Sequence, residues 1–450
     1  MLAAAALGVL GAPAAAQTSD AAIRAALSDP AHNVAPGCVA GTFAHGQPTG
    51  LVAQGYADLA EQRPLDGDSL FYAASISKQF TALAAATLVA RGELSLGDDV
   101  RQYLPELPAY EAPVTVAMLM HHTSGIRDSL GLLRMAGVSD VGTASKDEAL
   151  GLLFRQQQTQ FTPGTQYKYS NGGYLLLAEI VERVSGEAFA DYAQHAIFDP
   201  LGMERSFFLN DNSPAKGTFA HGYGPEGDGF VLRDSFPRFS GSGGLMLSMN
   251  DLARYEYDIE QGHRVWTPEV TQIMLAPGRY TDGSLIDDGG GLAYAGGLHL
   301  GEKGGQQVIV HTGSAEAFKH AYLRLPGQHS AFAVLCNRGD WKATDRLKAV
   351  MAASDVRYPG MPLSSPEGRF YSSELNTYFR LTPVDDGIAV EVTSPFIAAP
   401  VVQHYEADDD GGFHHETMSI ATTDNPDHLR LKRGTTAELT LTRVDQGAGQ

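Results

Sequence analysis

The chain has 450 residues, a formal net charge of -20 and a hydrophobic content of 43%. This length exceeds that of one typical domain, so it predicts a large unit with a smaller one, and the hydrophobic content is enough for a packed core. The acidic balance argues against nucleic acid and anionic membranes as partners, because both bind basic surfaces.

The first sixteen residues have the composition of a targeting segment. Residues 1–16 are small and apolar and end in Ala14-Ala15-Ala16, just before Gln17. This run resembles the apolar region and A-x-A cleavage site of a signal peptide, although the usual basic start is missing. It is too short to span a bilayer, and no other stretch is long and apolar enough to do so. The sequence therefore predicts a signal peptide over 1–16 and a periplasmic or secreted protein without stable membrane insertion.

The next segments predict a hairpin and then a helix. Residues 35–57 alternate in polarity and turn at Ala44-His45-Gly46-Gln47, which is typical of a β-hairpin. An alanine-rich helix is predicted from Thr81 to Ala90, where Arg91-Gly92 provides a C-terminal cap.

The start of this helix carries a candidate nucleophile. Ser75 and Lys78 are three residues apart, so on a helix they lie on one face. A lysine that is partly desolvated beside a serine can be neutral and accept the serine proton, which makes the hydroxyl a nucleophile. A lone Ser-x-x-Lys is usually a chance pair, and its meaning depends on other motifs.

Two further motifs follow in the chain. Tyr169-Ser170-Asn171 precedes an apolar helix, and His311-Thr312-Gly313-Ser314 ends an apolar strand. Ser-x-x-Lys, then Tyr-x-Asn, then a basic residue followed by Thr-Gly is the signature order of a superfamily of serine acyl-transferases. The chain resembles this superfamily, which includes penicillin-binding proteins and class C β-lactamases, in its esterase and D-aminopeptidase-like branch. The resemblance covers about 34–350 and includes the segments 71–74, 118–125, 161–164, 200–203 and 243–248.

The resemblance implies a role for each motif residue. Ser75 would attack an acyl carbonyl and form a covalent acyl-enzyme. Lys78 and Tyr169 would share the proton transfers, and which of them is the base stays open. Asn171 would orient Lys78 or the substrate amide. The backbone N–H groups of Ser75 and Ser314 would form the oxyanion hole.

His311 departs from the pattern of the penicillin-recognising members. Most of them place lysine before Thr312-Gly313, where its charge meets the carboxylate of a β-lactam or a D-Ala-D-Ala end. A histidine is largely neutral at pH 7 unless a neighbour raises its pKa. The sequence therefore favours an ester, amide or D-amino-acid peptide that lacks this carboxylate. A penicillin-binding D,D-peptidase or a β-lactamase remains an alternative.

The resemblance also implies the fold, an α/β domain in which an antiparallel sheet is combined with a helical subdomain. Strands at both ends of the domain enclose a helical excursion over 94–249, and a helix near 342–353 closes the domain on the sheet. The first and last strands would be antiparallel neighbours. Cys38 opens the one and Cys336 closes the other, so either a disulfide or two buried thiols are compatible with the pattern.

A proline- and serine-rich stretch marks the end of this domain. The predicted boundaries are a hydrolase domain over 17–356, a linker over 357–366 and a C-terminal domain over 367–450. Segments of period two in the C-terminal domain predict a small antiparallel β-barrel or sandwich, similar to the lipocalin-like domains of some members of this branch. Such a barrel can enclose a ligand, but a packing or specificity role is more usual.

Other reaction classes lack their motifs. The chain has no G-x-S-x-G elbow of an α/β-hydrolase and no H-E-x-x-H cluster of a zinc hydrolase. A non-catalytic protein that binds cell-wall fragments stays open as an alternative. The sequence thus predicts a serine hydrolase that acts on a small-molecule or peptide substrate, and it implies no metal or organic cofactor. Its oligomeric state is left open.

Overall fold

The computed structural model describes residues 14–210, 219–359, 366–384, 387–407, 412–423, 425, 427–433 and 438–444. The segment predicted as a signal peptide lies largely outside these residues, as does the middle of the predicted linker. The described chain divides into two compact units. The first comprises the residues up to Gly301 and Gln307–Val356, and the second comprises Glu302–Gln306 and the residues from Arg357 on. Among the described residues, no helix combines the length and apolar character needed to cross a membrane.

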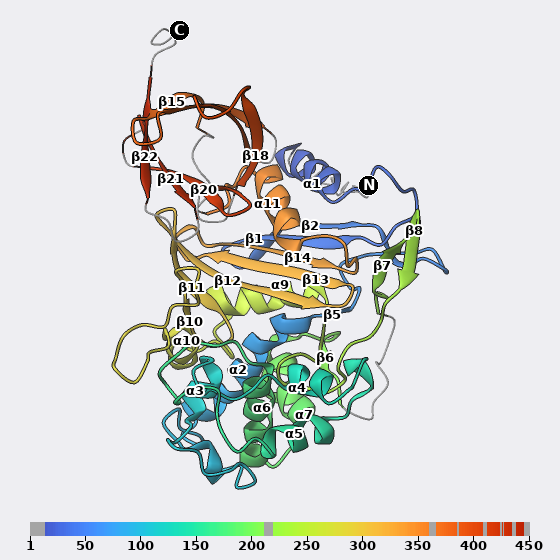
Figure 1. Cartoon of the computed structure of the whole chain (residues 1–450). Coiled ribbons are helices and arrows are strands. Elements are labelled where there is room, and N and C mark those ends of the chain that lie inside the picture. Colours follow the sequence, from blue (N-terminus) through green and yellow to red (C-terminus); the bar gives the residue numbers. More distant parts are fainter. Residues whose placement is uncertain are drawn as a thin grey trace, which may run out of the picture. The chain divides into compact units, whose positions relative to one another are not determined.

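A seven-stranded sheet is the centre of the first unit (Figure 1). Strand β1 (Cys38–Ala44) pairs antiparallel on one side with the last long strand, β14 (Ser330–Cys336), and on the other with its own hairpin partner, β2 (Gln47–Gln54). The predicted hairpin and the predicted neighbourhood of first and last strands are thus present. In spatial order the strands are β10 (Ala293–Tyr294), β11 (His299–Lys303), β12 (Gln306–Ala315), β13 (Phe318–Leu325), β14 (Ser330–Cys336), β1 (Cys38–Ala44) and β2 (Gln47–Gln54).

A disulfide joins the two ends of this unit. Cys38 and Cys336 are direct register partners on β1 and β14, and their sulfur atoms are bonded across a sequence separation of 298 residues. Of the two states that the sequence left open, the structure has the disulfide.

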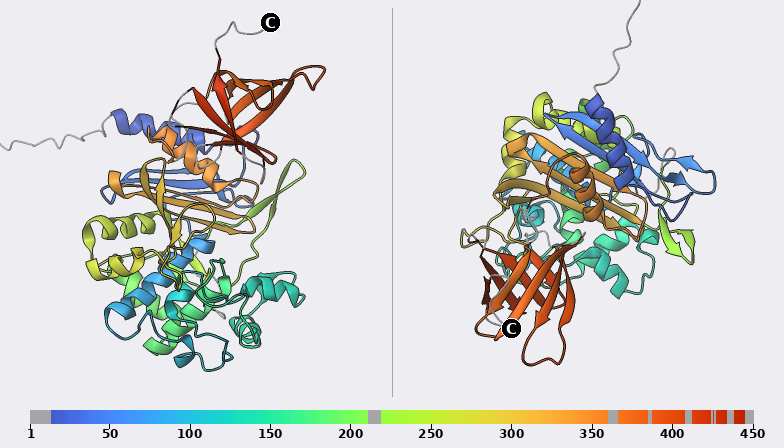
Figure 2. Two further views of the ribbon diagram at one scale, coloured as in Figure 1. Left: turned by 60° about the vertical axis from the view of Figure 1, so that its left-hand side comes forward. Right: turned by 90° about the horizontal axis from the view of Figure 1, so that it is seen from above.

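Helices cover both faces of the sheet, as the views in Figures 1 and 2 show. Helices α1 (Ala14–Ala26) and α11 (Ala343–Ala353) pack on one face, and α9 (Met249–Tyr257) packs on the other. Beyond α9 lies the helical half of the unit. It contains α2 (Ser77–Ala90), α3 (Val116–Met120), α4 (Ser129–Met135), α5 (Lys146–Phe154), α6 (Asn171–Ser185), α7 (Phe189–Ala193), α8 (Asp199–Leu201) and α10 (Pro268–Leu275).

Short strands that the sequence pattern does not predict lie within the helical excursion and in the segment just before it. Strands of two to four residues are too short to show a period-two pattern. One of the small sheets they form pairs Phe71–Tyr72, just before Ser75, with Leu245–Leu247. The short strands are β3 (Tyr56–Asp58), β4 (Arg63–Pro64), β5 (Phe71–Tyr72), β6 (Phe207–Phe208), β7 (Tyr223–Glu226), β8 (Gly229–Leu232) and β9 (Leu245–Leu247).

Helix α2 is the central helix of the unit. Twelve of its fourteen residues are buried, including Lys78 and Gln79. A helix that is apolar on most of its circumference belongs in a protein interior. The chain approaches it closely at Gly297, where a Cβ atom would lie 2.5 Å from the Gln79 nitrogen. The helix that carries Lys78 is therefore held on all sides.

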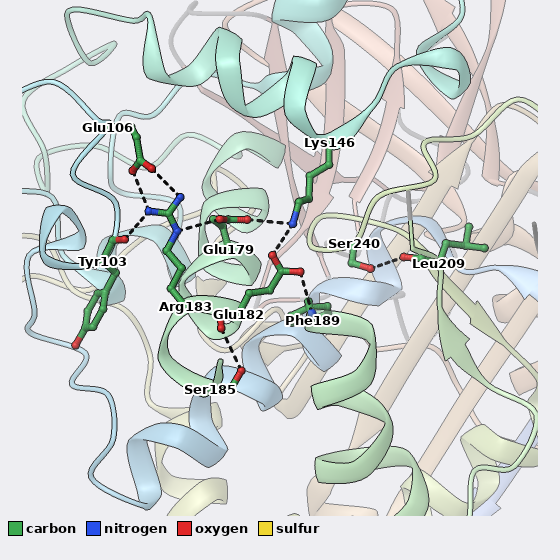
Figure 3. Close-up of polar contacts among 10 residues, drawn as sticks. All are labelled: Tyr103, Glu106, Lys146, Glu179, Glu182, Arg183, Ser185, Phe189, Leu209 and Ser240. Carbon is green, nitrogen blue, oxygen red and sulfur yellow. Dashed lines mark hydrogen bonds and ion pairs between the residues drawn. The ribbon is translucent and has the colours of Figure 1, made fainter. Parts of the chain in front are cut away.

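Helix α6, which begins at Asn171, is fixed by an ion-pair cluster (Figure 3). Lys146 on α5 contacts Glu179 at 3.1 Å and Glu182 at 2.5 Å, both on α6. Arg183, one residue further on, pairs with Glu179 at 3.0 Å and with Glu106 at 2.9 Å. The cluster ties α6 to α5 and to the loop that carries Glu106.

The second unit is a closed barrel of eight antiparallel strands, which confirms the predicted barrel-like β domain. Strand β15 closes the barrel by pairing with β22. Alternate residues such as Phe379 and Leu381, or Ile388 and Val390, point into a buried apolar core. The strands are β15 (Gly368–Ser372), β16 (Thr377–Val384), β17 (Gly387–Thr393), β18 (Val401–Ala407), β19 (Gly412–His415), β20 (Met418–Thr422), β21 (His428–Arg433) and β22 (Leu439–Arg443).

Candidate active site

Ser75 lies on a short 3-10 turn, Ala74–Ile76, that leads directly into α2. Its side chain is partly exposed, whereas both neighbours are buried. Ala74 has a φ of 48°, a left-handed conformation that residues other than glycine rarely adopt. Backbone strain of this kind is concentrated at functional sites, where the surrounding structure enforces it. Here β5 before the turn and α2 after it hold the turn in place.

Lys78 lies one helical turn after Ser75 and is fully buried. Its Nζ atom is 3.1 Å from Ser75 Oγ, 2.9 Å from Asn171 Oδ1 and 2.8 Å from the Ser242 carbonyl oxygen. Burial lowers the pKa of Lys78 to about 7, although the negative charge of Asp128 opposes this shift. At neutral pH a large fraction of this amine is therefore uncharged.

Tyr169 completes the group around Ser75. Its phenol interacts with the Ser75 side chain, and its ring centroid lies 4.7 Å from Lys78 Nζ. Burial raises the pKa of Tyr169 well above its usual value, and the Asp128 charge adds to this shift. The phenol is therefore protonated at neutral pH.

The loop between α3 and α4 holds the Tyr-Ser-Asn motif in place through hydrogen bonds. The Ser170 N–H donates to His122 Nδ1 at 3.2 Å, and the Ser170 hydroxyl donates to the Arg127 carbonyl oxygen at 3.2 Å. Asp128 accepts from the Asn171 backbone N–H at 2.9 Å and from Asn171 Nδ2 at 2.7 Å. His122 is buried, and burial holds its pKa well below the usual value. This histidine therefore ties down the motif as a neutral ring.

His311 is buried on β12 and is neutral. Its Nδ1 lies 2.7 Å from the Thr312 carbonyl oxygen, which can only accept, so Nδ1 carries the proton. The Tyr294 hydroxyl lies 3.2 Å from Nε2 and donates to it. Burial, together with His299 and Lys78, holds the pKa of His311 well below its usual value. His299 itself lies 2.5 Å from Asp288.

The remaining residues of the third motif lie at the end of β12. Thr312 and Ser314 are exposed, and the Ser314 hydroxyl accepts a hydrogen bond from Lys319 at 2.7 Å. Gly313 lies so close to the turn before Ser75 that a Cβ atom there would be 2.6 Å from the Ala73 carbonyl oxygen. Only glycine allows β12 to approach the turn this closely.

The structure thus brings the sequence-predicted residues together. Ser75 and Asn171 are both hydrogen-bonded to Lys78 Nζ, and the Tyr169 ring lies beside the same amine. His311 is adjacent, with its ring centroid 6.3 Å from that of Tyr169. Four partners were missed by sequence reasoning because none belongs to a motif with a recognised spacing: Asp128, Ser242, Tyr294 and Lys319.

Two other sequence expectations concern the surroundings of this group. The mixed glycine, proline and aromatic content of the segment 211–236 predicts a lid or specificity loop that lines the site, and its residues 211–218 lie outside the described part of the chain. Its last residue, Phe236, stacks on Tyr72 at a ring-centroid distance of 4.3 Å. Within the described residues, no group of three or more His, Cys, Asp or Glu side chains is arranged to hold a metal ion.

Comparison with known proteins identifies the family. Residues 22–355 match the family model described as Beta-lactamase. Penicillin-binding protein 4* of Bacillus subtilis (strain 168) is 29% identical over 364 residues, which are 76% of this chain and 78% of that protein. A D-aminopeptidase of Cereibacter sphaeroides (strain ATCC 17023) is 28% identical over 335 residues, which are 74% of this chain but only 61% of the relative.

A solved structure shows the same fold over most of the chain. The octameric penicillin-binding protein homologue from Pyrococcus abyssi superposes with a TM-score of 0.64 at 23% identity, and the match covers 91% of this chain and 96% of that one. Because the family model covers most of the chain and the fold agrees, the chain belongs to the beta-lactamase family.

Proposed function

We propose that this serine hydrolase of the beta-lactamase family uses Ser75 as its nucleophile and Lys78 as the base that activates it. The observation that carries the proposal is the environment of Lys78 Nζ. Two carbonyl oxygens, from Asn171 and Ser242, lie within 2.9 Å of it and can only accept hydrogen bonds. A neutral amine has two N–H groups, so these two acceptors use both. Its lone pair then faces Ser75 Oγ, 3.1 Å away.

The reaction proceeds in two halves. Lys78 takes the Ser75 proton while Oγ forms a bond to the substrate carbonyl carbon, and the backbone N–H groups of Ser75 and Ser314 stabilise the oxyanion. Tyr169, which stays protonated because burial raises its pKa, donates a proton to the leaving nitrogen or oxygen as that bond breaks. Water then attacks the acyl-enzyme, and the same groups return the protons.

The substrate is an amide, ester or peptide of a D-amino acid that presents no carboxylate to β12. The neutral, buried His311 offers no positive charge to such a carboxylate. D-aminopeptidases among the relatives support this substrate class. The similarity to a penicillin-binding protein supports a second candidate, a D,D-peptidase or β-lactamase activity. The substrate, rather than the nucleophile, separates the two.

The disulfide supports an exported location, since such bonds persist in oxidising compartments such as the periplasm or the cell exterior. We therefore place the mature hydrolase outside the cytoplasm. Fractionation of cells that express the full chain would detect it in the periplasm or medium, and a product confined to the cytoplasm would contradict this assignment.

The nucleophile is tested by intact-mass spectrometry after exposure to a fluorophosphonate and, separately, to a penicillin. We expect one fluorophosphonate adduct on the wild type and none on Ser75→Ala. Failure to label the wild type would overturn the proposal and favour the alternative of a non-catalytic protein that binds cell-wall fragments. Ser77→Ala is the matched control, because this buried neighbouring hydroxyl interacts with the Leu245 N–H rather than with Lys78.

The substrate class is tested with enantiomeric amides. We expect the amide of D-phenylalanine to be hydrolysed faster than that of L-phenylalanine, and both faster than D-Ala-D-Ala peptides. Preferential hydrolysis of D-Ala-D-Ala ends or of penicillin would replace this substrate class with the second candidate.

A further inference from the structure

Asp128 engages both of its carboxylate oxygens. Oδ1 accepts a hydrogen bond from the Gly131 N–H at 2.7 Å and thereby caps α4. Oδ2 accepts two bonds from Asn171, at 2.9 Å from the backbone N–H and at 2.7 Å from the side-chain Nδ2. One carboxylate thus joins the start of α4 to the residue that contacts Lys78.

We propose that Asp128 is a positioning residue for the hydrolase reaction, because it fixes the Asn171 amide with its oxygen towards Lys78. This inference rests on the proposed function. A carboxylate can only accept hydrogen bonds, so the Asn171 NH2 group must face Asp128. The amide oxygen then faces Lys78 Nζ, at 2.9 Å. A reversed amide would set an oxygen against the carboxylate and an NH2 group against the amine.

Asp128 also contributes charge to the site. Its negative charge raises the pKa of Lys78, against the larger effect of burial, which lowers it. The other titratable groups that face Lys78 are the phenols of Tyr169 and Tyr174 and the imidazoles of His122 and His311. Burial keeps all four uncharged near neutral pH. Removal of the Asp128 charge therefore shifts the Lys78 titration to lower pH.

A capping role alone does not account for an aspartate at this position. Serine is also a good N-cap residue, but its single hydroxyl cannot serve Gly131 and Asn171 together. Asparagine has only one side-chain oxygen, so it can accept either from the Gly131 N–H, which caps α4, or from the Asn171 N–H groups, but not from both as aspartate does. Asp128→Ser therefore keeps the cap of α4 but removes the hydrogen bonds to Asn171 and the negative charge. This separates the capping role of Asp128 from its positioning role.

The experiment measures the rate of fluorophosphonate labelling of the full chain from pH 5 to pH 9. In Asp128→Ser we expect the acid limb of the profile to move down by about one pH unit. We expect the plateau rate to fall about tenfold or more, because Asn171 no longer holds Lys78 in line with Ser75. Asp99→Ser is the matched control, since the Asp99 side chain also caps a turn, the 3-10 turn Val100–Gln102, by accepting from the Arg101 N–H. This control should leave both the acid limb of the pH profile and the plateau rate unchanged.

A double variant tests whether Asp128 acts through Asn171. If it does, the plateau of Asp128→Ser with Asn171→Ala equals that of Asn171→Ala alone. Additive losses, or an acid limb that stays at the wild-type pH in a folded Asp128→Ser or Asp128→Asn, would overturn the inference alone. Absence of labelling in the wild type would overturn the proposed function, and this inference with it.

Discussion

Lys78 combines full burial with a position beside the candidate nucleophile. Burying a cation is unfavourable, and the protein responds by lowering the pKa of the amine to about 7. The unfolded chain, in which the lysine has its ordinary pKa, binds more protons than the folded chain between pH 7 and pH 10. Stability from this group therefore rises with pH across that window and is lowest below pH 7.

Replacing Lys78 with methionine should separate stability from activity. We expect Lys78→Met to be inactive towards fluorophosphonate but more stable than the wild type by about 2 to 5 kcal/mol at pH 6, since an apolar side chain carries no ionisation penalty. The gain should shrink as the pH rises towards 10. Urea denaturation at several pH values measures it.

Lys342→Met is the control for this change, because Lys342 is exposed. It should alter neither activity nor the pH dependence of stability. A Lys78→Met protein that is less stable than the wild type at pH 6 would show that the hydrogen bonds of the amine outweigh its desolvation.

His311 should determine how the site treats substrate carboxylates. In His311→Lys we expect the ratio of kcat/KM for a D-Ala-D-Ala peptide to that for its methyl ester to rise about tenfold, because a charge-assisted hydrogen bond becomes available. His311→Gln, which is neutral like the native ring, should leave the ratio unchanged. A ratio in His311→Lys equal to the wild-type value would show that His311 does not face the carboxylate.

The residues of the site divide by how the sequence encodes them. Ser75, Lys78, Tyr169, Asn171 and His311 stand in local motifs with an order along the chain, so they could be predicted. Asp128 and Ser242 act only because the fold brings their oxygen atoms to Asn171 and Lys78. Nothing in their local sequence distinguishes them from an ordinary helix cap or loop serine.

Helix α6 begins at the site and is held at its far end by the ion-pair cluster of Figure 3. The backbone N–H of Phe189 also donates to Glu182 there, at 2.9 Å. Burial raises the pKa of Glu182, whereas hydrogen bonds and the Lys146 charge keep that of Glu179 low. Lys146 thus contacts both carboxylates, whereas Arg183 pairs with Glu179.

Removing the Lys146 cation should destabilise the first unit in a pH-dependent way. We expect Lys146→Ala to lose about 1 to 2 kcal/mol at pH 8, because two partly buried carboxylates are left to repel each other. Without Lys146 the folded-state pKa of Glu182 rises further, so the loss should grow as the pH rises and nearly vanish at pH 5. Chemical denaturation at pH 5 and pH 8 measures this difference.

The double variant Lys146→Ala with Glu182→Gln should recover most of the loss at pH 8. Lys168→Ala, a change at an exposed lysine, is the control and should have no effect. A loss that is the same at both pH values would assign it to packing of the lysine stem rather than to charge.

Elements with a long, regular pattern were predictable from sequence. The first hairpin, helix α2 and the closing helix α11 are present with boundaries within a few residues of those expected. Strands β6 to β9 were not predicted, and the segment that contains them was expected to be helical or loop. The pairing of β6 and β9 depends on partners far away in the chain, Met246 with Tyr72 and Phe207, whereas β7 and β8 pair with each other as a short hairpin.

The two units of the molecule differ in how their strands are ordered along the sequence. The barrel follows from period-two segments, and its strand number, which the pattern did not specify, is set by closure of β15 on β22. The first unit is assembled from both ends of its sequence. Its disulfide joins β1 to β14, so every residue of the candidate site lies inside the loop that this bond closes.

That topology predicts how the disulfide contributes to stability. A cross-link across 298 residues restricts the unfolded chain strongly, so we expect Cys38→Ala with Cys336→Ala to lose about 2 to 5 kcal/mol of unfolding free energy. Activity of the folded double variant should persist, because neither cysteine contributes a group to the site. Cys336 is paired with Lys319 through the strand backbone, which the substitution leaves in place. Urea denaturation, with fluorophosphonate labelling in the absence of denaturant, measures both. Reduction of the wild type should reproduce the loss, whereas reduction of the double variant should change nothing. Equal stability of the oxidised wild type and the double variant would show that the sheet alone holds β1 against β14.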